Sequence, residues 1–507
     1  MTHTGTDPVP TVEEVYETWH RLSPRMLMIH PVAELGRALP ALIGVFFASN
    51  HNGNGSWWSL AVAVVVLVFA VSRWFTTRLR ITPEQVQLRH GLIRRRTTAT
   101  PIDRIRTVDV TSHLLHRALG LARVSIGTGT SDRRGRGRLV LDGLDADAAE
   151  HLRSDLLHGR GAVSTAVVTD PGPSTPDEVI ARLDPAWIKL APFTLSGAFT
   201  ALLVFGFAER IWQETRVNLL HVGPLGWLDR QLGHASVLAA VLVVIALILT
   251  FVALASYAGY LLTFWDFRLT RHVGGTLHVD RGLLTSRATS IERRRLVGIE
   301  ISQPVLLRAV GGARTVAIAT GLRARRGAER GGEVLLPPAP AAVATAVAAV
   351  VLGTAGPFGA SLVSHGQRAL RRRLTRGLGG ALNATGVAEL LHLVGAHGWV
   401  VPLVALSIPI SVPVALDRYR SLGHALVDGY VVTRFGSVVR RHSAIACDGV
   451  IGWNTRSSLF QRRLGLTTLT ATTAAGKQGY RITDIDTVEA LRFVDAASPG
   501  LITEFRA

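Results

Sequence analysis

Arginine is the residue whose type and spacing offer the most chemistry in this sequence. Lys189 and Lys477 are the only lysines, so nearly all of the basic character comes from arginine. A guanidinium can donate two parallel N–H groups to one phosphate, a geometry that lysine does not match. The runs that could contact an anionic ligand are Arg94, Arg95, Arg96, Arg133, Arg134, Arg293, Arg294, Arg295, Arg440 and Arg441. Two explanations stay open for them: phosphate recognition, or the codon bias of a GC-rich genome.

Motifs for catalysis are missing. The sequence has no phosphate-binding GxxxxGK[ST], no GxGxxG opening a helix, no GxSxG and no HExxH. His113 and His116 have HxxH spacing, but a surface helical turn explains them better than a metal pair. Cys447 is the only cysteine, and we interpret it as a filler or surface residue rather than a nucleophile. We therefore expect no enzyme, no cofactor and no metal.

Composition points to a membrane protein with large polar domains. The chain has 507 residues, is 48% hydrophobic and carries a formal net charge of +19. Apolar residues in bilayer spans and charges in domains beside the membrane would account for both values. A single cysteine excludes an intramolecular disulfide, so the polar domains need not be extracellular. The N-terminus is acidic and has no basic segment leading into an apolar core, so we expect no cleavable signal peptide.

A segment of about 30 residues occurs three times and organises the rest of the chain. Each copy begins and ends on a glycine, and these pairs are Gly91 and Gly120, Gly282 and Gly311, and Gly436 and Gly465. The two glycines are 29 positions apart in every copy, and successive copies begin 191 and 154 residues apart. Three copies that align without a gap indicate one module used three times. The copies are too far apart for a solenoid, so other segments separate them.

An arginine stands three residues before the second glycine of each copy: Arg117, Arg308 and Arg462. Recurrence within one chain suggests a role in the fold of the module, such as capping carbonyl groups or covering a sheet edge. We favour this structural role over ligand binding.

Apolar runs alternate with polar blocks along the chain. We expect a polar lead-in (1–31), a transmembrane hairpin (32–75), module one (76–158), a linker (159–189), a second hairpin (190–262), module two (263–353), a basic linker (354–377), a third hairpin (378–416) and module three (417–507). The polar blocks alternate like β-strands and end in one helical pattern. Each module is thus predicted to be a small antiparallel sheet closed by a C-terminal helix.

Two assignments are ambiguous. Residues 337–353 are apolar enough for a span, but they fall where the closing helices of the other two modules fall, so we favour a closing helix. The third hairpin is the weakest, because its first arm carries Asn383, Glu389 and His392 and its second arm carries three prolines. Whether this hairpin crosses the membrane fully stays open.

Charge distribution sets the expected orientation. The loops at the far ends of the hairpins are uncharged or balanced, whereas the arginine runs lie in the modules and beside the span ends. The positive-inside rule then places both termini and all three modules in the cytoplasm, with six spans in the cell membrane.

Module one carries a recognisable pattern, a basic strand followed by IDRIRTVDVTSHLLHRALGLARVSI. Its matching residues are Arg104, Ile105, Val108, Leu114, Leu115, Arg117, Gly120, Leu121 and Ala122. Modules two and three keep parts of it, although Gly449 replaces the arginine in module three. The pattern resembles the bacterial pleckstrin-homology (PH) domain of YdbS/YdbT-like multi-pass membrane proteins. The resemblance implies an α+β protein in which three bent, seven-stranded antiparallel β-structures, each capped by a helix, alternate with three transmembrane hairpins.

The resemblance brings no shared chemistry, so the functional expectation rests on the arginines. Modules held beside the anionic inner leaflet could bind its head groups, and each nearby arginine can contribute about 1 kcal/mol. We expect a non-catalytic membrane scaffold that binds this leaflet, other membrane proteins, or both, for envelope maintenance or stress defence. The alternative is a component of an export or transport system. Nucleic acid is not an expected partner, because the arginine runs lack interleaved aromatics. A second copy of the chain, or a shorter member of the same family, remains a further possible partner.

Overall fold

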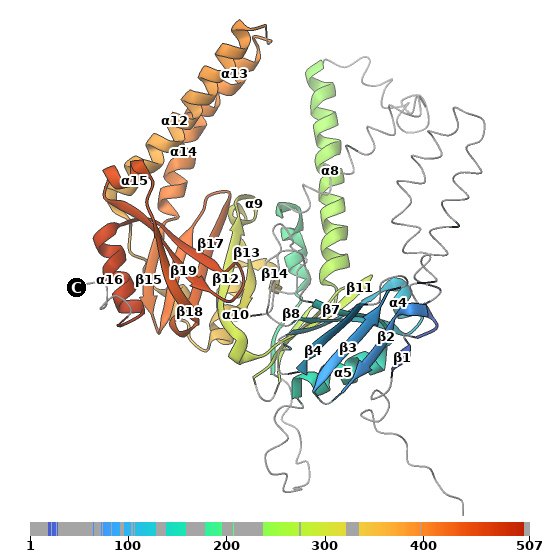
Figure 1. The fold of residues 1–507 in the computed structure, drawn as a ribbon. Coiled ribbons are helices and arrows are strands. Elements are labelled where there is room, and N and C mark those ends of the chain that lie inside the picture. The colour runs from blue at the N-terminus through green and yellow to red at the C-terminus, as the bar shows by residue number, and fades with distance from the viewer. Residues whose placement is uncertain are drawn as a thin grey trace, which may run out of the picture. The chain divides into compact units, whose positions relative to one another are not determined.

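In the computed structural model, residues 75–158, 178–194, 237–320 and 334–500 are described, with internal gaps at 83, 92–95, 103–104, 106, 128–137, 273–274 and 396. Isolated residues before 75 and Gly206 are described as well. Nearly all of the first expected hairpin (32–75) lies outside the described residues. So do Arg94, Arg95, Arg133 and Arg134 of the candidate contact set. The chain is drawn in Figure 1.

Each module consists of two three-stranded halves followed by a helix. In module one the first half is β2 (Arg78–Ile81), β3 (Gln85–His90) and β4 (Arg96–Pro101). The second half is β5 (Thr107–His113), the short helix α4 (Leu114–Ala118), β6 (Leu121–Gly127) and β7 (Arg138–Asp145), and the closing helix is α5 (Ala146–His158). A short strand β1 (His20–Arg21) pairs with β2.

Modules two and three repeat this order. Module two comprises β9 (Arg268–Arg271), β10 (Leu277–Arg281), β11 (Thr285–Ile291), η4 (Arg293–Arg295), β12 (Leu296–Pro304), α9 (Val305–Ala309), β13 (Gly312–Ala319), β14 (Val334–Pro340) and α10 (Ala341–Leu352). Module three comprises β15 (Gly423–Val427), β16 (Tyr430–Phe435), β17 (Val439–Ala446), η5 (Cys447–Gly449), β18 (Val450–Arg456), α15 (Leu459–Arg463), β19 (Leu466–Thr473), β20 (Gly479–Asp486) and α16 (Thr487–Ala497).

The halves of neighbouring modules share sheets. Strand β5 of module one pairs antiparallel with β11 of module two, and β12 of module two pairs antiparallel with β17 of module three. The expectation of one small sheet per module is therefore wrong. Within the described residues each module has six strands rather than the seven that the resemblance implies, and its two halves belong to different sheets.

Apolar residues from both halves and the closing helix form the core of a module. In module one, Leu79 and Val86 of the first half pack with Val124 and Leu141 of the second half and with Leu152 of α5. Module three has a similar core, in which Val431 of β16 packs against Leu469 and Ile482 and against Phe493 of α16. Burial of these side chains supplies the main driving force for the module fold.

Helix α10 is the closing helix of module two. It packs on β12, β13 and β14 and buries Ala344, Val347, Ala348, Val351 and Leu352. The preceding Pro337–Pro340 segment forms the end of β14, so the helix begins at Ala341. Its twelve residues are too few to cross about 30 Å of hydrocarbon. Its apolar character comes from burial against the sheet.

Outside the modules, the longest helices are α8 (Val237–Phe264) and α12 (Gly366–Leu393), while α13 (Val400–Ala405) and α14 (Ser407–Arg420) follow one another. The segments 246–264 and 400–420 are the two in the described residues that are long and apolar enough to cross a membrane. At about 1.5 Å per residue, the 21 residues of the second segment reach about 30 Å. Six spans in three hairpins remain a prediction.

Two sequence assignments near these helices need correction. The expected basic linker 354–377 contains the short helix α11 (Gly356–Gly359), and from Gly366 onward it is the beginning of α12. The second hairpin was expected to start at Leu190, but Leu190 lies buried in the 3-10 helix η2 (Pro185–Phe193), which follows the strand β8 (Glu178–Arg182). Residues 195–205 and 207–208 of that arm lie outside the described residues.

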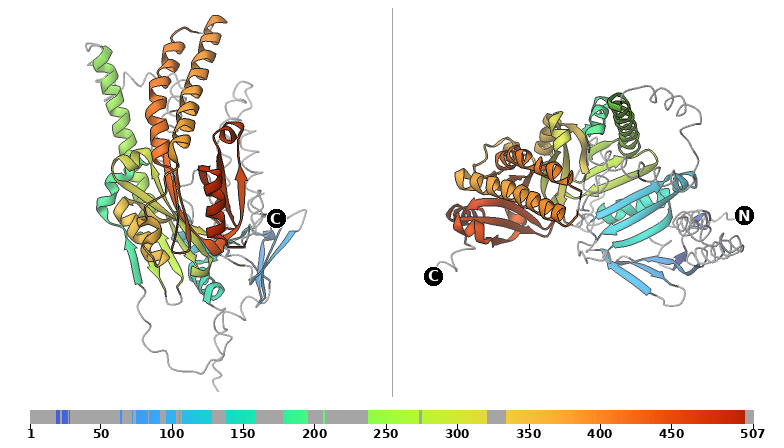
Figure 2. Two further views of the ribbon diagram at one scale, coloured as in Figure 1. Left: turned by 90° about the vertical axis from the view of Figure 1, so that its left-hand side faces the viewer. Right: turned by 90° about the horizontal axis from the view of Figure 1, so that it is seen from above.

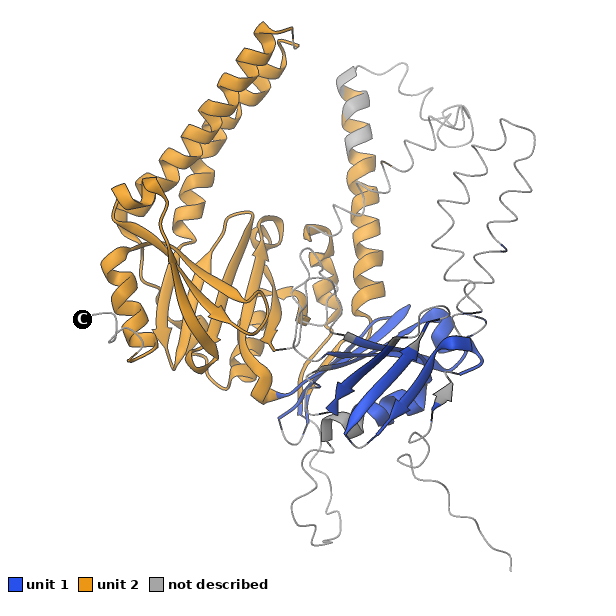
Figure 3. Ribbon diagram, viewed as in Figure 1, with its two compact units in different colours: residues 1–178, 271–292 blue, residues 179–270, 293–507 orange. Residues whose placement is uncertain are grey.

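The chain divides into two compact units, coloured in Figure 3. One unit contains residues 1–178 and 271–292, and the other contains residues 179–270 and 293–507. This division runs through module two, because β11 ends in the first unit and β12 begins in the second. Sheet sharing explains the division, since each half of module two is paired with a neighbouring module.

Candidate functional site

Each module exposes two large apolar side chains on the short helix that follows the first strand of its second half. The exposed pairs are Leu114 and Leu115 on α4, Val305 and Leu306 on α9, and Leu459 and Phe460 on α15. These residues occupy the same two positions of the repeat. Leu459 and Phe460 are the most exposed, at 69% and 70%. An apolar pair that faces solvent at the same place three times indicates a contact surface, because single exposed apolar residues are common but repeated pairs are not.

The local sequence holds these short helices in place. In α15, Ser458 accepts a hydrogen bond from the Gln461 backbone N–H, and the Gln461 side chain accepts one from the Ser458 backbone N–H. This capping box satisfies two backbone donors at the helix start. The third residue of each helix points inward: His116, Leu307 and Gln461 are buried. The first two residues consequently point outward.

Helix α9 is tied to the end of a candidate span. Arg308 Nη2 lies 3.0 Å from both carboxylate oxygens of Asp417, in the last turn of α14. Arg440 Nη2 also donates to Asp417 Oδ1 at 3.3 Å, and the Ser437 hydroxyl donates to Asp417 Oδ2 at 2.7 Å. Two guanidinium groups and one hydroxyl group therefore converge on one half-buried carboxylate. These contacts place α9 beside the C-terminal end of α14.

Helix α15 is tied to α12 in a similar way. Arg372 of α12 donates from Nη2 to the Ser458 hydroxyl at 3.2 Å and from Nε to Asp484 at 2.8 Å. Arg373 pairs with the other Asp484 oxygen at 2.7 Å, and Gln461 donates to Asp484 at 2.7 Å. Asp484 is buried, so these ionic hydrogen bonds are stronger than surface pairs. Within this unit, α9 and α15 lie at the end of the sheets from which α12 and α14 extend (Figure 1).

Helix α12 and the successive helices α13 and α14 run side by side away from this end (Figure 2). Gly377 permits their close approach, because a Cβ atom there would lie 3.2 Å from the Ser411 carbonyl oxygen. Small residues at such positions are typical of helix pairs in membranes. Trp399 at the far tip is 65% exposed. Tryptophan at the end of an apolar helix suits a membrane interface.

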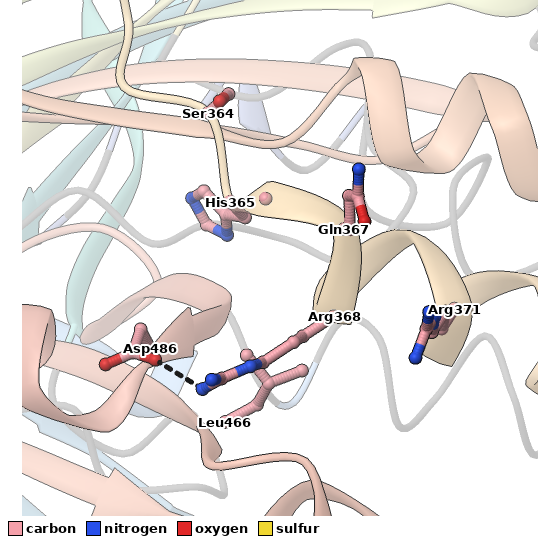
Figure 4. Close-up of a pocket in the computed structure, with 8 residues that line it drawn as sticks. Ser364, His365, Gln367, Arg368, Arg371, Leu466 and Asp486 are labelled. Atoms are coloured by element: carbon pink, nitrogen blue, oxygen red, sulfur yellow. Dashed lines mark hydrogen bonds and ion pairs between the residues drawn. The ribbon is translucent and has the colours of Figure 1, made fainter.

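A cavity of about 510 Å³ lies beside α15, at the basic start of α12. Figure 4 shows Arg368 directed at Asp486, whose Oδ2 atom is 3.3 Å from Arg368 Nη1. Arg371 also lines the cavity, and Asp486 in addition accepts a hydrogen bond from the backbone N–H of Val488. Two guanidinium groups against one carboxylate leave the walls with an excess positive charge. The cavity could receive one anionic group.

The predicted arginine clusters lie at opposite ends of the modules. Arg440 and Arg441 begin β17, which pairs with the end of β12 next to α9. Both are already engaged within the chain, Arg440 with Asp417 and Arg441 with Glu300. Arg293, Arg294 and Arg295 form η4 at the opposite end of β12 from α9, and Arg293 and Arg294 are exposed there. One flat surface cannot contact both groups.

The repeat-signature glycines have positive φ, and two of the three signature arginines contact groups outside their own module. Gly120, Gly311 and Gly465 have φ values of 68°, 71° and 66°, in the left-handed region that favours glycine. Gly91, Gly282 and Gly436 also have positive φ. Arg117 donates to the Leu283 carbonyl oxygen at 2.7 Å, and this carbonyl belongs to the next module rather than to its own. Arg308 likewise reaches the segment that precedes module three, whereas Arg462 is exposed.

The remaining candidates for chemistry have ordinary contacts. His116 Nε2 lies 3.2 Å from Asp142 Oδ1, and His113 Nδ1 lies 3.0 Å from the Thr285 hydroxyl. Within the described residues, no group of three histidine, cysteine or acidic side chains could hold a metal ion. Burial, and secondarily Asp448, raises the pKa of the Cys447 thiol, which favours the less reactive protonated form.

Comparison with known families agrees with this geometry. The family model described as "Bacterial PH domain" matches residues 35–160, 217–356 and 379–498, one match for each module with the segment before it. The chain belongs to the bacterial PH domain family. No curated protein and no solved structure was found to match the chain. PH domains in general bind lipids or proteins, so membership of this family suggests binding of one of these two classes of partner.

Sequence reasoning missed the exposed apolar pairs. Leu114 and Leu115 enter the sequence analysis only as part of the family pattern, and the residues around His113 and His116 only as a surface helical turn. The signal was present, because each copy of the repeat has two apolar residues just before its signature arginine. Periodicity alone could not show which residues of a five-residue helix face outward.

Proposed function

We propose that the protein is a non-catalytic membrane scaffold whose PH modules rest on the anionic inner leaflet through their short helices. One observation carries the proposal: the three modules expose apolar pairs at the same repeat positions, and two of these pairs lie beside the ends of helices that could span the membrane. The apolar side chains would enter the interface, and arginines beside them would contact the head groups. Localisation in the cell membrane, with both termini in the cytoplasm, is part of this proposal.

The energies are sufficient for docking of a tethered module. Full burial of one large apolar side chain is worth about 1.5–3 kcal/mol. Arg462 and Arg463 lie next to the α15 pair, and an arginine near an anionic surface adds about 1 kcal/mol. Because the long helices would already hold the module at the bilayer, little translational entropy is lost on docking. A few such contacts would fix its orientation.

The cavity beside α15 gives this contact a site for one head group. Arg371 and Arg368 line it, and Asp486 neutralises part of their charge. A lipid phosphate would compete with Asp486 for Arg368 and would gain Arg371 as a second ligand. Bidentate guanidinium–phosphate geometry favours this exchange.

The arginines at the far end of the modules would serve a different partner. Arg293 and Arg294 are exposed on η4, away from α9, so they would face the cytoplasm when α9 faces the membrane. We propose that they contact acidic segments of other membrane proteins. The scaffold would then join a leaflet on one side to a protein on the other.

Transport is the second candidate and has less support. Polar residues inside a membrane indicate a pathway when they face the interior of a helix bundle. Asn383 and Glu389 of α12 are exposed among the described residues. The proposed scaffold does not use these residues, so substituting them by leucine separates the two functions.

Hydrogen exchange on the full chain in lipid nanodiscs tests the proposal. We expect the backbone amides of residues 459–465 to exchange more slowly in anionic than in neutral nanodiscs, and the difference to shrink as salt is added. Residues 293–295 provide the internal control, because they lie at the opposite end of the module fold. The full chain is needed, since an isolated module would lose the strand that it shares with its neighbour.

Two variants sharpen the result. Arg462→Gln combined with Arg463→Gln should reduce the dependence on anionic lipid, because Arg368 and Arg371 of the cavity remain, and should leave the exchange of the sheets unchanged. Arg492→Gln is the matched control, because Arg492 is an exposed arginine on α16 whose surface pair with Glu489 is weak. Equal exchange of residues 459–465 in both lipids at low salt would contradict the proposal.

A further inference from the structure

The two junctions between neighbouring modules have the same register. At the first junction Asp109 of β5 lies opposite Thr289 of β11, and at the second Glu300 of β12 lies opposite Ser443 of β17. Asp109 and Glu300 occupy the same position of the repeat, as do Thr289 and Ser443. The first strand of one module's second half therefore always meets the third strand of the next module's first half, in one fixed alignment.

A buried acid marks each junction. Asp109 accepts hydrogen bonds from the Thr289 hydroxyl at 2.8 Å and from Arg287 at 3.2 Å. Glu300 accepts a hydrogen bond from the Ser443 hydroxyl at 3.3 Å and pairs with Arg441 at 3.8 Å, and unlike Asp109 it also accepts hydrogen bonds from a lysine, Lys477, at 2.6 and 2.7 Å. The two arginines also occupy one repeat position. An acid on one strand thus meets an arginine and a hydroxyl on the other strand at both junctions.

The same two surfaces occur a third time, and there no described strand pairs with them. In the described residues β18 and β4 are the end strands of their sheets. β18 is the module-three counterpart of β5 and β12, and β4 is the module-one counterpart of β11 and β17. The arginine and hydroxyl recur on β4 as Arg96 and Thr98, and Asn454 of β18 stands where the acid stands in the other modules.

A glycine supplies an independent observation. A Cβ atom on Gly298 of β12 would collide with the Ala444 carbonyl oxygen of β17, so this glycine is needed for the close approach of the paired strand. Gly452 of β18 occupies the same repeat position, but nothing lies within 4 Å of a Cβ atom placed there. The space that β17 fills at Gly298 is open at Gly452.

Exposure differs in the same way. The β12 residues 298–302 are all buried, whereas their β18 counterparts, residues 452–456, are half-buried or exposed. Ile451, just before them, is 68% exposed. On β4, Thr97 and Ala99 are exposed, whereas Ser290 and Ala444, the counterparts of Ala99 at the junctions, are buried. An exposed edge strand of this kind can pair with another chain.

We propose that β18 of one copy of this protein pairs antiparallel with β4 of a second copy, in the register of the two internal junctions. That register places Asn454 opposite Thr98 and Thr455 opposite Thr97, and passes the backbone near Ala99 close to Gly452. The interface is heterologous, because β18 meets β4 and not itself, so association produces rings or open chains of copies. This inference is independent of lipid binding.

The proposed junction between β18 and β4 of two copies should be weaker than the two junctions within one chain. Asn454 offers Thr98 an amide oxygen instead of a carboxylate, and hydrogen bonds to charged groups are the stronger ones. Arg456 would lie opposite Arg96, where Thr111 and Ser302 stand at the internal junctions. Like charges facing each other oppose strand pairing. Association should accordingly be reversible and depend on protein concentration.

Crosslinking between differently labelled copies tests the proposal. The full chain is prepared in detergent with Cys447→Ser, and a single cysteine is introduced either as Thr97→Cys or as Thr455→Cys. A short bifunctional maleimide should give a crosslinked dimer when the two variants are mixed. Neither variant alone should give it, because the proposed register brings residue 97 next to residue 455 only. No dimer in the mixture at any concentration would overturn the proposal.

A chain with both cysteines distinguishes a second copy from closure within one chain. A ladder of dimers and larger species is expected. A product crosslinked only within the monomer would show that the two edges meet in one chain, and would also overturn the proposal. Lipid is absent from this experiment, so its failure is distinguishable from failure of the leaflet contact.

Two further substitutions test the register. Gly452→Val should abolish the mixed dimer, because the side chain would occupy the space of the incoming strand, while the monomer keeps its thermal stability. Gly359→Val is the matched control, at another glycine with nothing within 4 Å, and should leave the dimer yield unchanged. Asn454→Asp should strengthen association on the order of tenfold, the effect of one charge-assisted hydrogen bond. A mixed dimer that survives Gly452→Val would contradict the proposed register.

Discussion

Arg308 of the second PH module forms an ion pair with Asp417, which lies outside that module. The Nη2 atom of Arg308 is 3.0 Å from each carboxylate oxygen. One residue lies on the short helix that exposes Val305 and Leu306, and the other lies in the last turn of α14. The pair thereby connects the proposed lipid-contact surface to the helix that would cross the bilayer. Motion of α14 relative to the module would require breaking this connection.

Asp417→Asn should therefore destabilise the second unit. The substitution removes the charge that Arg308 and Arg440 share, and leaves two partly buried guanidinium groups without their carboxylate. We expect a loss of about 1–3 kcal/mol, the usual cost of such an unsatisfied group. Thermal unfolding of the full chain in detergent measures it. Glu489→Gln is the control, because its pair with Arg492 is exposed and 4.0 Å long. Equal unfolding temperatures for both variants would contradict this assignment.

Substitutions of two adjacent leucines on α9 distinguish a role in folding from a role in membrane contact. Leu307 is 1% exposed and Leu306 is 44% exposed. Leu307→Ala should cost about 2–5 kcal/mol of stability because it leaves a cavity in the core. Leu306→Ala should change the unfolding temperature little but reduce protection of α9 amides in anionic nanodiscs. The prediction is wrong if Leu306→Ala lowers stability as much as Leu307→Ala does.

Module three should lose stability in mild acid. Burial, and to a lesser extent neighbouring charge, lowers the pKa of His424 and of His442 to about 4. The unfolded chain, with pKa values near 6.5, binds more protons between about pH 6.5 and pH 4. Stability is thus complete above pH 6.5 and falls as the pH decreases toward 4. Unfolding measured at several pH values checks this trend.

The corresponding double variant is His424→Gln with His442→Gln. It should have a shallower dependence on pH between 6.5 and 4, even if it is less stable at pH 7. His397 is exposed at the far tip of the α12–α14 pair, so His397→Gln should leave the slope unchanged. A slope that is the same in the wild type and the double variant would assign the titration to other groups.

Sequence patterns predicted the modules but not their pairing. Gly91 and Gly120 each have a positive φ, and the number of residues between them is the same in every module. Their 29-residue spacing therefore recurs, and the constraint acts within one module. Closing helix α10 was also predictable, since its position in the repeat outweighed its apolar composition. The junction between Asp109 and Arg287 was not, because the residues are 178 positions apart and nothing local indicates a partner strand in another module.

The candidate site shows the same division. The sequence shows the arginine runs but not which end of the module each run occupies. Arg293–Arg295 and Arg440–Arg441 were therefore grouped, although they lie at opposite ends of the fold. Arg440 and Arg441 have acidic partners at Asp417 and Glu300, and a run of like charges does not reveal such partners. The end of the module at which a run lies depends on the direction of its strand, and turn sequences determine that direction only relative to the neighbouring strand.

Depth of Phe460 in the bilayer tests the central claim most directly. An environment-sensitive fluorophore is attached to Phe460→Cys or to Arg294→Cys, each with Cys447→Ser, and the full chain is reconstituted in nanodiscs with brominated anionic lipid. The account predicts strong quenching and a blue-shifted emission at position 460, and neither at position 294. Unquenched fluorescence at position 460, or equal quenching at both positions, would show that the short helices do not face the membrane.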